Sequence, residues 1–103
     1  MTAAQTTEAE LDPQKAWKAV KQNRSEGRLE TALGLAKTLA GRFPSEFRYQ
    51  LSAAELCNMV GRLEEAAPYL ERARQLGTDD DKAFEVLERL RIQLLQAEGR
   101  TDD

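Results

Sequence analysis

A short sequence occurs twice in this chain and constrains the fold more than any other feature. The residues GRLE begin at Gly27 and again at Gly61, an offset of 34 residues, and Ala32 matches Ala66 at the same offset. A regular offset of this length is typical of chains built from repeated supersecondary units, in which each unit buries its apolar face against the next one. The sequence therefore predicts two similar units stacked in chain order.

Apolar residues recur at helical spacing along most of the chain, and no segment alternates apolar and polar residues with β-branched enrichment. The pattern predicts an all-α fold. Asp12 before Pro13 favours a helix start, as do Ser45 and the Thr78-x-x-Asp81 spacing. Five glycines follow helical stretches and are interpreted as helix terminators: Gly27, Gly41, Gly61, Gly77 and Gly99. These signals together predict helices at 13–25, 28–41, 46–60, 62–76 and 80–97.

The period and the residue types resemble the tetratricopeptide repeat family over residues 13–98. The first copy matches the family pattern at Gly27, Leu29, Ala32 and Pro44. The second copy matches it at Gly61, Leu63, Ala66, Leu70 and Ala73, with Thr78 in place of the proline. The resemblance implies an antiparallel helix-hairpin solenoid with repeats at 13–46 and 47–80 and a capping helix at 81–98. The ends, 1–12 and 99–103, are polar and acidic, so we expect them to be flexible tails.

Composition excludes most enzyme chemistry. The 103 residues are enough for one domain, and they contain no histidine and a single cysteine, Cys57. A histidine-based triad, a His/Cys zinc site and an internal disulfide are therefore excluded, and Cys57 is expected to be a buried, inert thiol. We expect no catalytic residue, no bound metal, no cofactor and no small-molecule substrate.

The distribution of charge argues against nucleic acid as a partner. The chain carries 15 Lys and Arg against 18 Asp and Glu, a net charge of −3. Without residues 1–12 and 98–103, the chain has 14 basic and 12 acidic side chains, which is far from the basic excess typical of DNA- or RNA-binding proteins. Apolar runs are only a few residues long and no secretory signal is visible, so the sequence predicts a soluble, cytoplasmic chain without a membrane segment.

In the family that this chain resembles, the first helix of each hairpin lines a concave groove. With Gly27 and Gly61 in register, that surface predicts a partner-binding site at Trp17, Lys18, Lys21, Arg24, Arg48, Leu51, Ser52, Glu55, Met59, Lys82 and Arg89. Six basic side chains there face two acidic ones, Glu55 and Glu85, so we expect an acidic, partly apolar peptide or helix to bind. The alternative is that the charges are ordinary solvated surface and that Trp17 belongs to the core.

The helix at 80–97 has a wider apolar arc than an amphipathic surface helix needs. Phe84, Val86 and Leu95 widen this arc, and Ile92 lies outside it. These four residues form a candidate homodimer or client surface. The alternative is that the excess packs on neighbouring helices. Other large apolar residues are expected in the core: Leu29, Leu33, Leu35, Leu39, Phe43, Phe47, Leu56, Leu63, Tyr69, Leu70 and Leu76.

These observations predict a protein–protein interaction adaptor that binds a partner segment in a basic groove. Two alternatives remain open at this point. One is a small assembly or secretion chaperone, similar in size and layout to the repeat-type chaperones of type III secretion. The other is a structural subunit that associates with itself.

Overall fold

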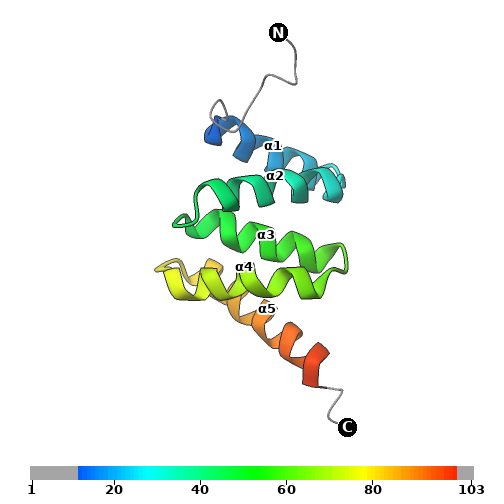
Figure 1. The fold of residues 1–103 in the computed structure, drawn as a ribbon, viewed down its shortest axis with the longest axis vertical. Coiled ribbons are helices and arrows are strands. Elements are labelled where there is room, and N and C mark those ends of the chain that lie inside the picture. Colours follow the sequence, from blue (N-terminus) through cyan, green and yellow to red (C-terminus); the bar gives the residue numbers. More distant parts are fainter. Residues whose placement is uncertain (1–11, 100–103) are drawn as a thin grey trace.

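The computed structural model describes residues 12–99, which form five helices (Figure 1). In chain order these are α1 (Pro13–Ser25), α2 (Leu29–Arg42), α3 (Phe47–Met59), α4 (Leu63–Leu76) and α5 (Asp81–Gly99). Every bound lies within two residues of the range expected from the sequence. The predicted all-α fold is confirmed for this part of the chain. The expected tails fall almost wholly at 1–11 and 100–103, outside the described residues.

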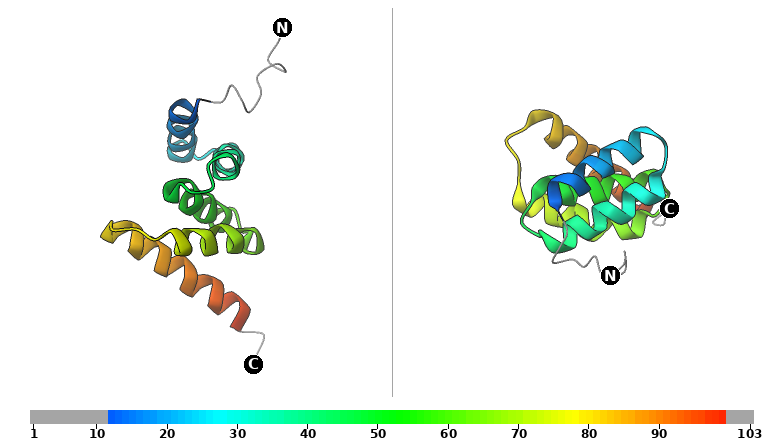
Figure 2. Two further views of the ribbon diagram at one scale, coloured as in Figure 1. Left: turned by 60° about the vertical axis from the view of Figure 1, so that its left-hand side comes forward. Right: turned by 90° about the horizontal axis from the view of Figure 1, so that it is seen from above.

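The helices stack as successive antiparallel hairpins (Figures 1 and 2). Helix α1 packs on α2, α2 packs on α3, and α3 packs on α4, so that each of the two inner helices lies between two neighbours. Helix α5 packs on α4 and more lightly on α3, and it diverges from the stack toward its C-terminal end (Figure 1). This arrangement is consistent with a helical hairpin repeat.

The two GRLE sequences form the same turn in both hairpins. Gly27 and Gly61 have φ values of 84° and 82°, a left-handed conformation that a side chain would disfavour. In each turn the amide after the glycine donates a 2.8 Å hydrogen bond to a carbonyl near the end of the preceding helix, that of Asn23 or of Cys57. This bond satisfies a helix-end carbonyl and reverses the chain. The sequence repeat thus sets the repeated geometry.

The cap predictions were right at α1 and wrong at α3 and α5. Asp12 Oδ1 accepts hydrogen bonds from the first-turn amides of α1, at 3.0 and 3.3 Å. Ser45 does not cap α3, because the capping position is Glu46 and its side chain makes no capping bond. At α5, Asp80 Oδ1 accepts from the amides of residues 82 and 83, and Thr78 accepts from the Asp80 amide instead of closing a box with Asp81.

Two of the predicted glycine terminators do not end a helix in the expected way. Gly41 lies inside α2, and Gly99 is the last residue of α5. Gly77 follows α4 with a φ of 76°, as expected. A helix can pass through a glycine when the next residues remain helical, at a cost of about 1 kcal/mol, so a glycine alone is a weak stop signal.

The core is built mainly from small residues where helices approach closely. Fully or almost fully buried apolar residues are Ala16, Val20, Ala32, Leu33, Ala36, Leu39, Ala40, Tyr49, Ala53, Ala54, Leu56, Cys57, Ala66, Leu70, Ala73, Leu87 and Leu90. Among the expected core residues, Leu29, Leu35, Phe43, Phe47 and Tyr69 are partly buried against this cluster. Leu63 is only partly buried, and Leu76 is 39% exposed and does not belong to the core, because it ends α4 beside the turn to α5.

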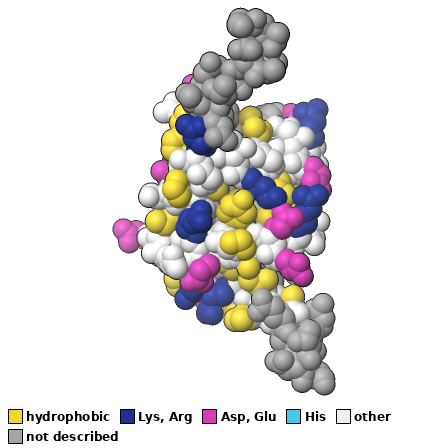
Figure 3. All heavy atoms as spheres, in the orientation of Figure 1, with side chains coloured by type: hydrophobic (Ala, Val, Ile, Leu, Met, Phe, Trp, Pro, Cys, Tyr) yellow, Lys and Arg dark blue, Asp and Glu magenta, His cyan; other side chains and the backbone are white. Residues whose placement is uncertain are grey.

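The face in Figure 3 carries acidic and basic side chains beside one another. Two ion pairs link α2 to the start of α4. One joins Lys37 to Glu65, and the other joins Glu30 to Arg62, the residue before α4, at 3.0 Å. Within residues 12–99, none of the helices is both long and apolar enough to span a membrane.

Candidate functional site

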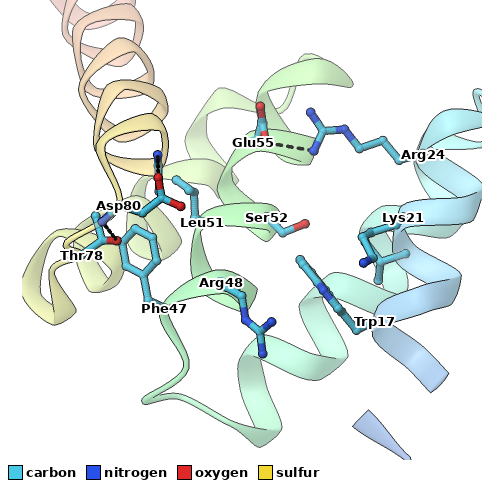
Figure 4. Close-up of a pocket in the computed structure, with 12 residues that line it drawn as sticks. Trp17, Lys21, Arg24, Phe47, Arg48, Leu51, Ser52, Glu55, Thr78 and Asp80 are labelled. Carbon is cyan, nitrogen blue, oxygen red and sulfur yellow. Dashed lines mark hydrogen bonds and ion pairs between the residues drawn. The ribbon is translucent and has the colours of Figure 1, made fainter. Parts of the chain in front are cut away.

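A hollow of about 330 Å³ opens between α1, α3 and the start of α5 (Figure 4). Its lining residues are Trp17, Val20, Lys21, Arg24, Phe47, Arg48, Leu51, Ser52, Glu55, Thr78, Asp80 and Ala83. These residues come from the first helix of each hairpin and from the turn into α5. The GRLE turns orient α1 and α3 alike, so both helices present their side chains to one shared space.

Trp17 forms one wall of the hollow. It is partly buried, and its ring lies 5.3 Å from the Tyr49 ring with an interplanar angle of 50°. Lys21 Nζ and Arg48 Cζ each lie 5.8 Å from the centre of the Trp17 ring. The ring therefore packs against the core through Tyr49 and presents a surface flanked by two cations (Figure 4). Trp17 thus combines features of the two alternatives from the sequence, a residue of the binding surface and a residue of the core.

The other end of the hollow is closer to neutral. Glu55 forms an ion pair with Arg24 at 3.0 Å and approaches Arg89 at 3.8 Å. Its side chain is only 16% exposed, so the two arginines compensate a partly desolvated carboxylate. Arg24 is therefore committed to an internal contact. Lys21 and Arg48 lie beside Trp17, whereas Glu55 lies beside Arg24 and Asp80 lies on the side of the hollow next to α5 (Figure 4).

The structure brings together seven of the eleven predicted groove residues. The four that do not line the hollow are Lys18, Met59, Lys82 and Arg89. Lys18 follows Trp17 by one residue, which turns its side chain about 100° around α1, away from the hollow. Met59 is 44% exposed at the end of α3. The expected excess of six basic over two acidic side chains is therefore reduced, within residues 12–99, to three against two in the lining.

Five lining residues were missed by the sequence analysis: Val20, Phe47, Thr78, Asp80 and Ala83. Val20 is one turn from Trp17 and Phe47 one turn from Leu51, so helical spacing from the predicted residues could have found both. Thr78 and Asp80 could not be found in this way. They reach the hollow because the turn between α4 and α5 lies beside Phe47 and Leu51 of α3, which is a tertiary contact (Figure 4).

The candidate surface on α5 is largely exposed. Phe84 is 52%, Ile92 49% and Leu95 51% exposed, and a shallow hollow lies beside Phe84 and Ile92. Val86 differs from the other three, because it is partly buried against the core and does not belong to this surface. The excess apolar arc of α5 therefore does not all pack on α3 and α4.

A third hollow, of about 390 Å³, lies between α2 and α4 beside the Lys37–Glu65 ion pair. The hydrogen bond from Lys37 lowers the pKa of Glu65, and the same bond raises the pKa of Lys37. Two basic side chains, Lys37 and Arg72, line this hollow together with Glu65 and Tyr69. Lys37 is engaged there by its ion pair with Glu65, whereas Lys21 and Arg48 in the first hollow lie beside the Trp17 ring.

Cys57 is buried, as expected, and burial raises the pKa of its thiol. A protonated, inaccessible thiol is a poor nucleophile. Within residues 12–99, no cluster of three or more Cys, Asp or Glu side chains is placed to hold a metal ion.

Comparison with known proteins finds no matching family model, no matching characterised protein and no matching solved structure. The site is therefore interpreted from its own geometry and from the repeat pattern of the sequence.

Proposed function

We propose that this chain is a tetratricopeptide-type adaptor that binds a short segment of another protein in the hollow between α1, α3 and the start of α5. The observation that carries the proposal is the Trp17 ring, partly buried against Tyr49 and flanked at 5.8 Å by Lys21 and Arg48. A ring in this setting favours a ligand that combines an apolar side chain with a nearby carboxylate.

The arrangement of the helices supports this proposal. Both GRLE turns start the second helix of a hairpin, so α1 and α3 are equivalent first helices. In tetratricopeptide repeats the first helices line the concave ligand groove, and the hollow of this chain lies along the corresponding surface. Its volume of about 330 Å³ is at the lower end for ligand sites, which suits a few side chains of a peptide rather than a whole domain.

In the proposed binding, the charged residues affect the rate of association and the apolar surface affects the rate of dissociation. Arg48 pairs with Glu46 at 3.3 Å on the surface, where its side chain remains 60% accessible, and Lys21 is exposed as well. Exposed cations accelerate the encounter with an acidic segment, and salt screens this attraction. Trp17, Phe47 and Leu51 provide partly buried apolar surface, which slows dissociation once a side chain is seated.

The test is a fluorescence titration, because Trp17 is the only tryptophan of the 103 residues. The probe is a synthetic peptide with alternating Leu and Glu, and the control peptide has Lys in place of Glu. We expect the acidic peptide to change Trp17 emission and the basic peptide not to do so, with weaker binding in about 1 M salt.

Variants locate the binding surface. Lys21→Glu combined with Arg48→Glu should weaken binding of the acidic peptide by about tenfold, because two attractive charges become repulsive. Lys18→Glu is the matched control, since it changes an exposed lysine of α1 outside the hollow. A flat titration, or an equal loss from Lys18→Glu, would refute the proposed site.

A further inference from the structure

Four residues form one face of α5 that is separate from the hollow. Phe84, Glu88, Arg91 and Leu95 are spaced by four, three and four residues, which places them on one side of a helix. Phe84 and Leu95 are each about half exposed, at 52% and 51%. Between them Arg91 Nη2 donates to Glu88 Oε1 at 2.9 Å. Along the helix, the face therefore carries an apolar, an acidic, a basic and an apolar side chain in this order.

The equivalent face of α3 is composed differently. The residues 34 positions earlier are Gln50, Ala54 and Cys57, and all three are buried. They are neutral because α3 lies between α2 and α4. A further hairpin laid on α5 in the same way would bury the Glu88–Arg91 ion pair, and the cost of desolvating such a pair can exceed the attraction within it. An apolar client would meet the same cost. An occupant that offers opposite charges at the matching positions along the helix would offset this cost.

A second copy of α5 supplies them. When two copies run antiparallel about a twofold axis midway between Glu88 and Arg91, Glu88 of each lies opposite Arg91 of the other. The same operation places Phe84 opposite Leu95, because the two residues are equally far from that axis along the helix. An isologous contact requires a pattern that is complementary to itself, and this face meets that requirement.

We infer that α5 is the interface of an antiparallel homodimer, in which the two Glu88–Arg91 pairs form a ring of four alternating charges flanked by Phe84 and Leu95. Ile92, 49% exposed, widens one edge of the apolar contact. The face is accessible, because Phe84 and Leu95 are about half exposed and the Glu88 and Arg91 side chains are 33% and 40% accessible. Helix α5 itself diverges from the stack toward its C-terminal end (Figures 1 and 2). This inference does not depend on the hollow or on its ligand.

The contact is expected to be modest. A 19-residue helix is about 28 Å long, and a single pair of such helices buries less than the roughly 1,200 Å² of standard interfaces. The dimer should therefore dissociate in the micromolar range.

The experiment uses sedimentation equilibrium of the full chain at about 1 to 200 μM, a range that brackets a micromolar dissociation constant. Glu88→Arg gives a face with two positive charges, and Arg91→Glu gives one with two negative charges. Each variant alone should weaken the dimer by at least tenfold. Mixing the two variants should restore it as a heterodimer, because every opposed pair is then attractive again.

Glu71→Arg is the matched control, since it makes the same change in charge as Glu88→Arg on an exposed residue of α4. It should sediment like the wild type. Circular dichroism of each variant distinguishes lost folding from lost pairing, and the mixed sample provides a second check, because unfolded chains would not pair on mixing.

A wild-type chain that stays monomeric throughout this range overturns the inference, whether or not the face binds another apolar protein. Single variants that dimerise like the wild type, or a mixture that forms no heterodimer, overturn it as well. The Lys21→Glu and Arg48→Glu substitutions should leave dimerisation unchanged, so failure of the peptide site and failure of the dimer are separate results.

Discussion

Helices α3 and α5 occupy equivalent positions in the 34-residue repeat, yet they differ in almost every property that burial controls. Helix α3 lies between α2 and α4 and buries residues on most of its circumference: Tyr49, Gln50, Ser52, Ala53, Ala54, Leu56 and Cys57. Helix α5 lies against α4 and α3 on one side, and its fully buried described residues are Leu87 and Leu90. A helix of this stack becomes core only when it is covered on both sides.

The residue types follow this difference position by position. Where α3 has a hydrogen-bonded Gln50, α5 has an exposed Phe84. Helix α3 ends before Gly61, whereas α5 continues through the equivalent residue, Leu95. At one pair of equivalent positions both helices have a buried leucine, Leu56 in α3 and Leu90 in α5. Equivalent buried leucines with divergent outer residues are consistent with α5 being the last helix of the stack within the described residues.

The largest effect on stability should come from the two equivalent buried leucines, Leu56 and Leu90. Leu56→Ala is expected to lower the free energy of unfolding by about 4 kcal/mol, because Leu56 is fully buried between two helices that cannot both relax into the space. Leu90→Ala should cost about 2 kcal/mol, since α5 can shift toward α4. Urea denaturation measures both. Equal losses would show that α5 is held as tightly as α3.

A second effect concerns Gln50, whose Nε2 donates to the carbonyls of Ala40 and Phe43 at 2.9 and 3.3 Å. Gln50→Glu keeps the size of the side chain but removes both donated bonds in a buried place, so we expect a loss of about 2 kcal/mol. Phe84→Ala, at the equivalent position of α5, should change the stability of the dilute monomer by less than about 0.5 kcal/mol. A large loss from Phe84→Ala in urea titrations would contradict the exposed position of that ring.

Glycine should be favoured at position 61, in the turn after α3, and disfavoured at the equivalent position 95, inside α5. Gly61→Ala should cost about 1 to 2 kcal/mol, because Gly61 has a φ of 82°. At the equivalent position Leu95→Gly should cost up to about 1 kcal/mol, since the helix continues there. Gly34→Ala is the control. Gly34 lies inside α2, and a Cβ added there would meet no atom within 4 Å, so the substitution should stabilise the fold by about 0.5 to 1 kcal/mol. Thermal unfolding would report all three signs.

The smallest effect is a pH dependence that arises from Cys57 in α3. Burial raises the pKa of Cys57 above its ordinary value of 9.0, so above about pH 9 the unfolded chain releases this proton before the folded chain does. Stability should therefore fall as pH rises past 9. The raised pKa of Lys37 acts in the same direction at higher pH. Urea titrations at pH 7 and 10 measure the decrease, and it should be smaller in Cys57→Ala. An unchanged decrease would assign it to other groups.

The sequence was informative about elements and less so about which side chains meet. The helix bounds, the Asp12 cap and the Gly27 and Gly61 turns follow from local rules, because capping bonds and left-handed glycines involve residues only a few positions apart. Gly41 and Ser45 mislead for the same reason, since local propensity permits a cap or a stop without requiring one. Seven of the groove residues were predicted because one register, set by Gly27 and Gly61, orients α1 and α3 together.

By itself the sequence determined an all-α chain with two like hairpins and a fifth helix, since period, glycine placement and apolar spacing act over short distances. Only the tertiary structure decided that Glu55 binds Arg24 and approaches Arg89, that Asp80 reaches the hollow, and that Val86 is covered while Phe84 and Leu95 are not. The physical reason is that exposure and ion pairing depend on the crossing of helices far apart in the chain. A single-helix pattern specifies which residues share a face, and the neighbouring helix specifies whether that face meets protein or water.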